Sequence, residues 1–145
     1  MSPERSPVLV VGYDGSEESQ AAVAYAARRA GPAGRIVVVH ALAPSLPLVN
    51  VVTVGAESSE HGAAVLDGLL MEQGDELTGT TFDLEAPRAR PAEALVDTAR
   101  KVDADEIVVG SRGLGRVESA LGSVSAELLR QADRPVTVIP RGALG

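Results

Sequence analysis

The sequence contains no cysteine and no tryptophan, and aromatic residues make up only 2% of its 145 positions. Without cysteine, the chain has no disulfide, no thiolate nucleophile and no cysteine-ligated metal cluster. The scarcity of aromatic side chains argues against a stacking platform for single-stranded nucleic acid. The core must be built from Val, Leu, Ile and Ala, which is typical of a parallel sheet covered by alanine-rich helices.

Positive charge is also scarce. Thirteen basic residues stand against 20 acidic ones, which gives a formal net charge of −7 at pH 7. This balance opposes broad attraction to DNA, RNA or anionic membranes, so any anion must be bound by a local site. The apolar run at residues 7–11 is too short for a signal peptide or a membrane span. We therefore expect a soluble cytoplasmic protein, with residues 1–145 forming one domain.

Several nucleotide-binding and hydrolytic motifs are missing. No G-x-G-x-x-G follows the first apolar run, and no glycine-rich loop ends in Gly-Lys-Ser or Gly-Lys-Thr. These absences argue against a dinucleotide dehydrogenase and a conventional phosphate-loop ATPase. The G-x-S-x-G elbow of hydrolases is absent as well. We expect a protein that is not primarily catalytic; slow nucleotide hydrolysis remains the enzymatic alternative, since no base is clearly placed to activate water.

Short apolar runs alternate with helical patterns along the chain. This alternation predicts an α/β fold, namely an open five-stranded parallel sheet with helices on both faces and right-handed crossovers. The predicted strands are residues 8–11, 36–39, 80–84, 107–109 and 136–139, and the predicted helices begin after Ser16, near Ser58, at Pro91 and near Ser123.

The second predicted helix, residues 58–76, follows a mixed segment. We interpret residues 44–59 as a long loop or a partly ordered lid, because Pro47, Asn50 and Gly55 interrupt its apolar residues. The predicted apolar face of the helix consists of Ala64, Val65, Leu69 and Leu70.

Residues 106–125 are organised as a strand, a glycine-rich loop and the start of a helix. Glycines recur at Gly110, Gly113, Gly115 and Gly122. Glycine allows close approach to the backbone, and a helix start offers unpaired N–H groups, so this arrangement favours a phosphate site. The alternative is a long surface loop with an N-cap. The strand before it and the helix after it make the binding site the preferred interpretation.

Polar side chains of this stretch have two interpretations as well. Ser111, Ser123 and Ser125 are candidate hydroxyl donors to the phosphates. Arg112 and Arg116 either contact phosphates or pair with nearby carboxylates such as Glu118.

Three strand ends are expected to converge, because ligands of open α/β sheets bind outside the carboxyl ends of the strands. These ends are residues 12–14, 40–41 and 110–115. Asp14 is a candidate ligand of Mg²⁺ or of a ribose, with a simple turn residue as the alternative. His40 is interpreted as a packed or rim histidine. A hydrolytic triad of Ser111, His40 and Asp14 is the less favoured alternative.

Four segments together resemble the universal stress protein family: VVGYDGSEES, VVVHA, DADEIVVGSRGLGRVESALGSVS and RPVTVIP. The resemblance covers most of the chain and is strongest to the ATP-binding members. It implies the adenine-nucleotide α-hydrolase-like fold with strand order 3-2-1-4-5, and a role in the stress response. It also implies ATP, or AMP or cyclic AMP, as the ligand, together with Mg²⁺.

The same resemblance implies a homodimer paired through the last strand, Val136 to Ile139. The residues themselves favour this interpretation, because an apolar strand at a sheet edge invites pairing with a second copy. A covering of the edge by the carboxyl-terminal tail is the alternative.

The resemblance implies a role for individual site residues. Gly12 would lie beneath the nucleotide, Asp14 near the ribose or Mg²⁺, and the backbone of Ala41 against adenine. The remaining candidates would line the ribose and phosphates or close over them: Gly110, Ser111, Arg112, Gly113, Leu114, Gly115, Arg116, Gly122, Ser123, Val124 and Ser125.

The glycine-rich loop departs from the family pattern by one residue. Positions 114–121, eight residues, separate Gly113 from Gly122, where the ATP-binding members have nine. A dimeric interaction module of the same fold that holds no nucleotide is therefore the main alternative. No function is assigned to residues 85–91.

Overall fold

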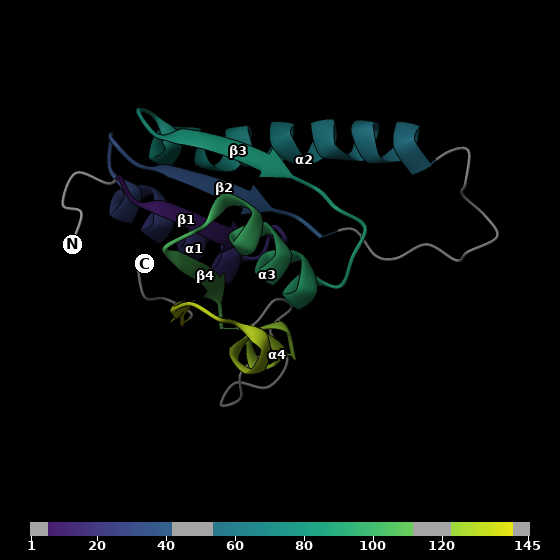
Figure 1. Ribbon diagram of the computed structural model, residues 1–145. Coiled ribbons are helices and arrows are strands. Elements are labelled where there is room, and N and C mark those ends of the chain that lie inside the picture. Colours follow the sequence, from purple (N-terminus) through teal and green to yellow (C-terminus); the bar gives the residue numbers. More distant parts are fainter. Residues whose placement is uncertain (1–5, 42–53, 112–122, 141–145) are drawn as a thin grey trace.

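The computed structural model describes residues 6–41, 54–111 and 123–140. Within this part of the chain, strands and helices alternate regularly (Figure 1). The elements are β1 (Val8–Gly12), α1 (Glu17–Ala30), β2 (Arg35–Val39), α2 (Val54–Leu77), β3 (Thr81–Glu85), α3 (Pro91–Val102), β4 (Glu106–Gly110), α4 (Ser123–Gln131) and β5 (Val136–Ile139).

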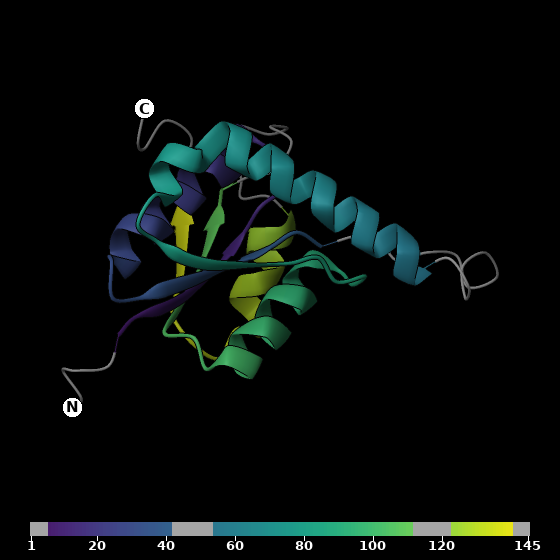
Figure 2. The same ribbon diagram turned by 90° about the horizontal axis from the view of Figure 1, so that it is seen from above.

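The strands form one parallel sheet in the order β3-β2-β1-β4-β5, as the sequence and its resemblance predicted. β1 is the central strand: Leu9 is in register with Ile36 of β2 on one side and with Glu106 of β4 on the other. Helices α1 and α2 cover one face of the sheet, and α3 and α4 cover the other (Figure 2).

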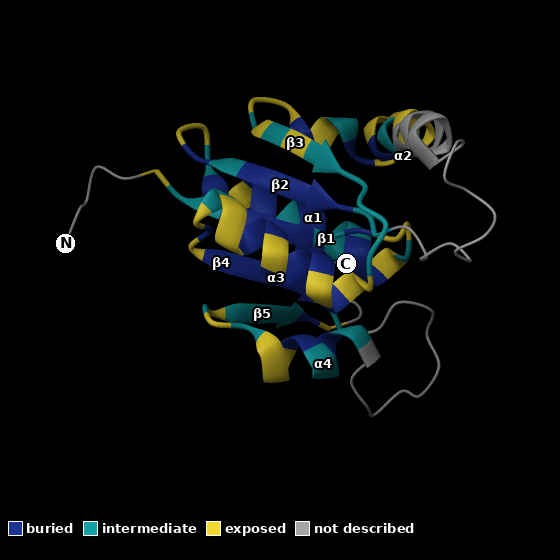
Figure 3. Cartoon of the chain, turned by 45° about the vertical axis from the view of Figure 1, so that its right-hand side comes forward, coloured by how far each residue is buried: buried dark blue, intermediate teal, exposed yellow. Residues whose placement is uncertain are grey.

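The side chains of the central strands alternate between two apolar layers. Leu9 and Val11 pack under α1 and α2, whereas Val10 packs under α3 and α4. These strands are buried on both faces, while β3 and β5 at the edges are only partly buried (Figure 3). Continuous apolar runs in the sequence are the expected signature of such strands.

The helix ends follow the chemistry expected of them. Ser16 caps α1 by accepting a hydrogen bond from the Ser19 backbone N–H, and Gly31 ends the helix with a φ of 66°. Pro91 opens α3, where its missing N–H costs nothing, and Asp103 ends it in the left-handed region.

Helix α2 corrects two of the predictions. It begins at Val54, so residues 54–59 are helix and not loop; residues 44–53 of the expected lid lie outside the described residues. Gly55 was taken as an interruption, but it falls in the first turn, where backbone N–H groups have no partner within the helix in any case.

The predicted apolar face of α2 is also wrong in part. Leu69 is buried and Val65 packs against the same apolar cluster, but Ala64 and Leu70 are exposed. Consecutive helical residues point roughly 100° apart, so Leu70 cannot share the buried stripe of Leu69. Among the described residues, no helix combines the length and apolar character needed to cross a membrane.

Candidate functional site

A pocket of about 120 Å³ opens at the carboxyl ends of β1, β2 and β4. This is where the chain direction reverses, since β2 and β4 flank β1 on opposite sides. The described residues that line it are Gly12, Tyr13, Asp14, Ser16, Ser19, Val39, His40, Ala41, Pro91, Leu95, Val109, Gly110 and Val124.

One wall of the pocket is polar and belongs to the loop between β1 and α1. The Asp14 carboxylate accepts a hydrogen bond from the Ser16 N–H at Oδ1 (3.0 Å), and the Asp14 N–H donates to the Ser19 hydroxyl (3.2 Å). Asp14 is therefore a turn residue, as one interpretation held, and it is also exposed at the pocket. The positive end of the α1 dipole lies at this wall.

The opposite wall is apolar. Pro91 and Leu95 reach it from α3, and Val124 reaches it from α4. Gly12 is closely packed at the base, because a Cβ atom there would lie 3.3 Å from Val109 and 3.4 Å from Leu95. Such a combination of an apolar wall with a few convergent polar groups is typical of small-molecule sites.

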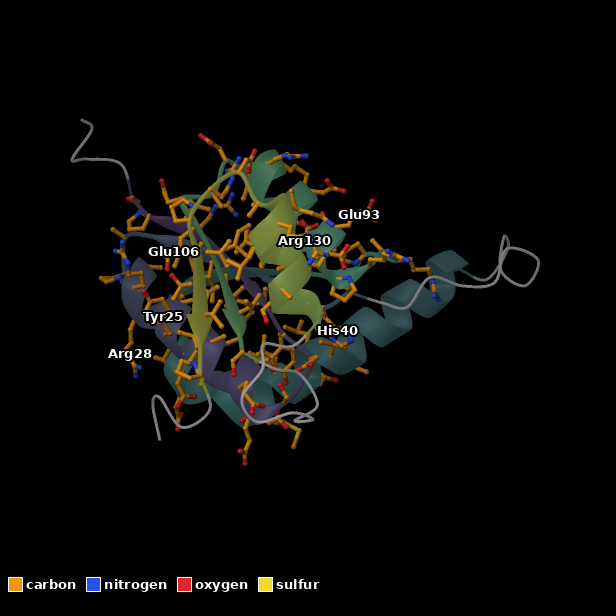
Figure 4. The ribbon with its side chains drawn as sticks, turned by 90° about the horizontal axis from the view of Figure 1, so that it is seen from below. Tyr25, Arg28, His40, Glu93, Glu106 and Arg130 are labelled. Carbon is orange, nitrogen blue, oxygen red and sulfur yellow. The ribbon has the colours of Figure 1, made fainter. Side chains whose placement is uncertain are left out.

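Tyr13 and His40 connect the ends of β1 and β2. The Tyr13 N–H donates to the Val39 carbonyl, and His40 Nδ1 lies 2.9 Å from the Tyr13 carbonyl oxygen. The two rings are tilted, with centroids 6.5 Å apart. His40 is thus a rim histidine held by backbone contacts, as predicted. Figure 4 shows it at the opposite end of the sheet from Glu106.

These contacts differ from those of a hydrolytic triad. In a triad, the histidine Nδ1 would pair with the aspartate carboxylate. Here His40 Nδ1 instead contacts a backbone carbonyl, and Asp14 Oδ1 accepts from a backbone N–H.

The Tyr13 hydroxyl donates to Glu72 Oε1 of α2 at 2.7 Å. The pKa of Tyr13 is raised above its ordinary value. The largest cause is burial, followed by the hydrogen bond to Glu72, the negative charge of Glu72 and the charge of Asp14. Tyr13 therefore remains a protonated donor at neutral pH.

Ser111 and Ser125 hold the end of β4 to α4. The Ser125 hydroxyl is buried and donates to the Ser111 carbonyl at 3.1 Å, and the Ser111 N–H donates to the Ile139 carbonyl. Neither residue is among those that line the pocket.

The structure brings five of the predicted site residues together around the pocket: Gly12, Asp14, Ala41, Gly110 and Val124. Ser123 is the first residue of α4. The other predicted residues lie outside the described residues: Arg112, Gly113, Leu114, Gly115, Arg116 and Gly122.

The sequence reasoning missed the residues that α3 and the start of α1, with its N-cap, contribute. Ser16 and Ser19 were recognisable as helix-cap chemistry, and their position directly after the β1 loop was the available signal. Pro91 and Leu95 carried no such signal, because their place at the pocket depends on how α3 crosses the sheet.

The described residues hold no group of three or more His, Asp or Glu side chains suited to a metal ion. Asp14 is an exposed single carboxylate at the pocket. Such a donor fits Mg²⁺ held mainly by phosphates and water, which is how Mg²⁺ is commonly bound in nucleotide sites.

Comparison with known proteins identifies close relatives. A universal stress protein of Mycolicibacterium smegmatis is 33% identical over 140 residues, covering 90% of this chain and 47% of that protein, so the chain spans about half its length. One from Thermus aquaticus is 34% identical over 142 residues, covering 90% of this chain and 96% of its own. A solved universal stress protein in complex with cAMP is similar with a TM-score of 0.67 and 27% identity, over 93% of this chain and 97% of that one.

The family described as the Universal stress protein family matches residues 7–140, a range that includes every strand and helix described above. Together with the strand order and the pocket at the switch point, this match shows that the chain belongs to the universal stress protein family.

Proposed function

We propose that the chain binds an adenine nucleotide, ATP foremost, and acts as a cytoplasmic stress-response protein that responds to this ligand and is not primarily a catalyst. The observation that carries the proposal is the pocket at the β1–β4 switch point, with one apolar and one polar wall. A relative at 27% identity has been solved in complex with cAMP, which supports an adenine nucleotide as the class of ligand.

The two walls suit the two chemical halves of a nucleoside. Pro91, Leu95 and Val124 offer apolar contact to a purine ring, beside the backbone of Ala41. Asp14 and Ser16 offer oxygen atoms to ribose hydroxyls. None of the described lining residues is Lys or Arg, so we assign the phosphates to the glycine-rich loop, to the α1 amino terminus and to Mg²⁺ near Asp14.

The first test is to denature freshly purified protein and to identify any released nucleotide by mass spectrometry, with calorimetric titration of ATP, AMP and cyclic AMP. We expect near-stoichiometric adenine nucleotide, or measurable binding. Asp14→Ala is expected to weaken ATP binding in the presence of Mg²⁺, while Asp97→Ala, on the exposed side of α3, leaves it unchanged. The absence of both released and titrated nucleotide would reject the proposal.

The glycine-rich loop supports a second candidate. Because it is one residue shorter than the ATP-binding pattern, the alternative function is a dimeric interaction module that holds no nucleotide. Slow nucleotide hydrolysis is the third possibility, and product formation that disappears in Asp14→Ala would support it.

We also propose a homodimer paired through β5. The Ile107 N–H donates to the Pro135 carbonyl, and the Ser111 N–H donates to the Ile139 carbonyl. The backbone groups of alternate residues of β5 therefore face β4. In a parallel ladder the backbone groups of the intervening residues, Val136 and Val138, then point to the open edge. A second strand would find its partners there.

The dimer is tested by sedimentation equilibrium of the unmodified chain, Val138→Pro and Val138→Ala. Proline removes the outward N–H, whereas alanine keeps it and removes a similar amount of packing. We expect the proline variant to be the more monomeric of the two. An unmodified chain that is monomeric at all concentrations would reject the dimer.

A further inference from the structure

The residue between Gly12 and Asp14 connects the pocket with a distant helix. The backbone of Tyr13 is held at the pocket by Val39 and His40, and its hydroxyl donates to Glu72 Oε1 of α2 at 2.7 Å. A displacement of the β1 loop therefore moves a group that is bonded to α2.

Helix α2 is broken at the position next to Glu72. Gln73 has non-helical angles, φ −133° and ψ 22°, so the helix consists of two segments that meet there. A local break of this kind is a place where a long helix changes direction.

The buried side chain of Gln73 makes one strong contact and lacks another. Its Nε2 donates to the Gln20 carbonyl at 2.6 Å, while its Oε1 is buried without a hydrogen-bond partner among the described residues. The Gln20 side chain in turn donates to Glu72 Oε1 (3.3 Å) and to the Gly15 carbonyl (3.1 Å). An unsatisfied buried acceptor destabilises this arrangement relative to one in which it is paired.

The side chains described before the break, those of residues 63–72, anchor α2 only lightly. Leu69 is buried, but Leu70 is 44% exposed and Met71 is 87% exposed. In the ribbon views the amino-terminal part of α2 extends past the carboxyl ends of β2 and β3 (Figures 1 and 2). A helix with few buried side chains belongs to the less stable part of a fold, which is the part that responds to ligands.

We propose that Tyr13 is a positioning residue that couples occupancy of the pocket to the conformation of α2 on both sides of Gln73. A ligand that contacts the Gly12–Asp14 backbone shifts the Tyr13 hydroxyl, and the Tyr13–Glu72 hydrogen bond passes this shift to the break. Coupling between two sites is reciprocal, so a partner bound to α2 changes nucleotide affinity by the same factor. The identity of the ligand, but not the coupling, rests on the proposed function.

The first experiment measures hydrogen exchange of residues 63–77 with and without saturating ATP and Mg²⁺. Tyr13→Phe keeps the ring beside His40 and removes only the hydroxyl. Tyr25→Phe is the matched control, because it removes a tyrosine hydroxyl bonded to Glu106 at the other end of the sheet (Figure 4). We expect ATP to slow exchange in residues 63–77 on the order of fivefold in the unmodified chain and in Tyr25→Phe. In Tyr13→Phe, compared at an ATP concentration that saturates that variant, this change in residues 63–77 should be largely lost.

The second experiment needs no ligand and separates this proposal from the proposed function. In Gly12→Ala the added Cβ lies 3.3 Å from Val109 and 3.4 Å from Leu95, so either these side chains or the pocket end of β1 must shift to make room for it. We expect this change to alter exchange in residues 63–77, and the alteration to disappear in the Gly12→Ala, Tyr13→Phe double variant. If ATP does not bind but this pattern is observed, the proposed ligand is wrong and the coupling stands. If residues 63–77 respond to neither change, or respond equally with and without the Tyr13 hydroxyl, the coupling is rejected.

Discussion

Gly110 packs directly on Glu18 of α1, so a Cβ atom at position 110 would lie 2.6 Å from the Glu18 Cβ. The next nearest atoms are the Glu18 backbone carbon and oxygen, at 2.9 and 3.0 Å, and these cannot rotate away. We expect Gly110→Ala to lower the free energy of unfolding by about 1–3 kcal/mol, measured by urea denaturation. Gly68→Ala, where nothing lies within 4 Å, should instead raise it by about 0.5–1 kcal/mol. Equal effects of the two variants would contradict the close approach.

Arg134 holds the end of α3. Its Nη1 donates to the carbonyl oxygens of Ala99 (2.9 Å) and Ala104 (2.8 Å). Hydrogen bonds from charged groups contribute about 1.5–3 kcal/mol, so Arg134→Ala should lower the free energy of unfolding by an amount in that range. Arg130→Ala, at an exposed position of α4, is the control and should change it little.

The pKa of the Asp133 carboxyl depends on the same arginine. Hydrogen bonds from Arg134 and then Arg100 lower its pKa below the ordinary value. A lowered pKa in the folded state means that the stabilisation is present above the unfolded pKa of about 3.9 and is lost as the pH falls. We expect NMR titration to find a raised Asp133 pKa in Arg134→Ala. An unchanged midpoint would show that the Arg134 contact does not persist in solution.

The raised pKa of Tyr13 predicts that the folded protein loses stability at alkaline pH. Its pKa is raised in the folded state, mainly by burial and by Glu72. The stabilisation is therefore complete below the unfolded pKa of about 10 and is lost as the pH rises above it. Urea denaturation at neutral and alkaline pH should show a smaller alkaline loss in Tyr13→Phe than in the unmodified chain or Tyr25→Phe. A loss of the same size in all three would assign it to other groups.

Leu69 and Leu70 are neighbours in α2 with opposite environments. Leu69 is fully buried, whereas Leu70 is 44% exposed. We expect Leu69→Ala to lower the free energy of unfolding by about 2–5 kcal/mol and Leu70→Ala to change it by less than about 1 kcal/mol. Comparable losses for both would mean that α2 buries a different face in solution.

The strands were predictable because their signal is local. Val8 to Val11 and Ile107 to Val109 are unbroken apolar runs, and a strand buried on both faces requires such a run. The helix ends were predictable at Ser16, Gly31 and Pro91 for a similar reason, since each residue acts on the backbone beside it.

Only the pocket residues that directly follow a strand could be predicted from the sequence. Gly12, Asp14 and Gly110 follow apolar runs, so topology places them together. Leu95 is an apolar residue of α3, and nothing local distinguishes a leucine that covers the sheet from one that lines a pocket. Leu70 was misplaced because it is apolar and adjacent to Leu69, while burial depends on direction around the helix axis.

The central place of β1 in the sheet has a consequence for biosynthesis. Leu9 pairs with Glu106, so β1, once synthesised, lacks its β4 neighbour until residues 13–105 have followed. Pairings so distant in sequence close large loops and slow the folding reaction. The β1–β4 crevice is consequently assembled late. A nascent chain that stops short of β4 has β1 and β2 but lacks Gly110, and with it one side of the pocket.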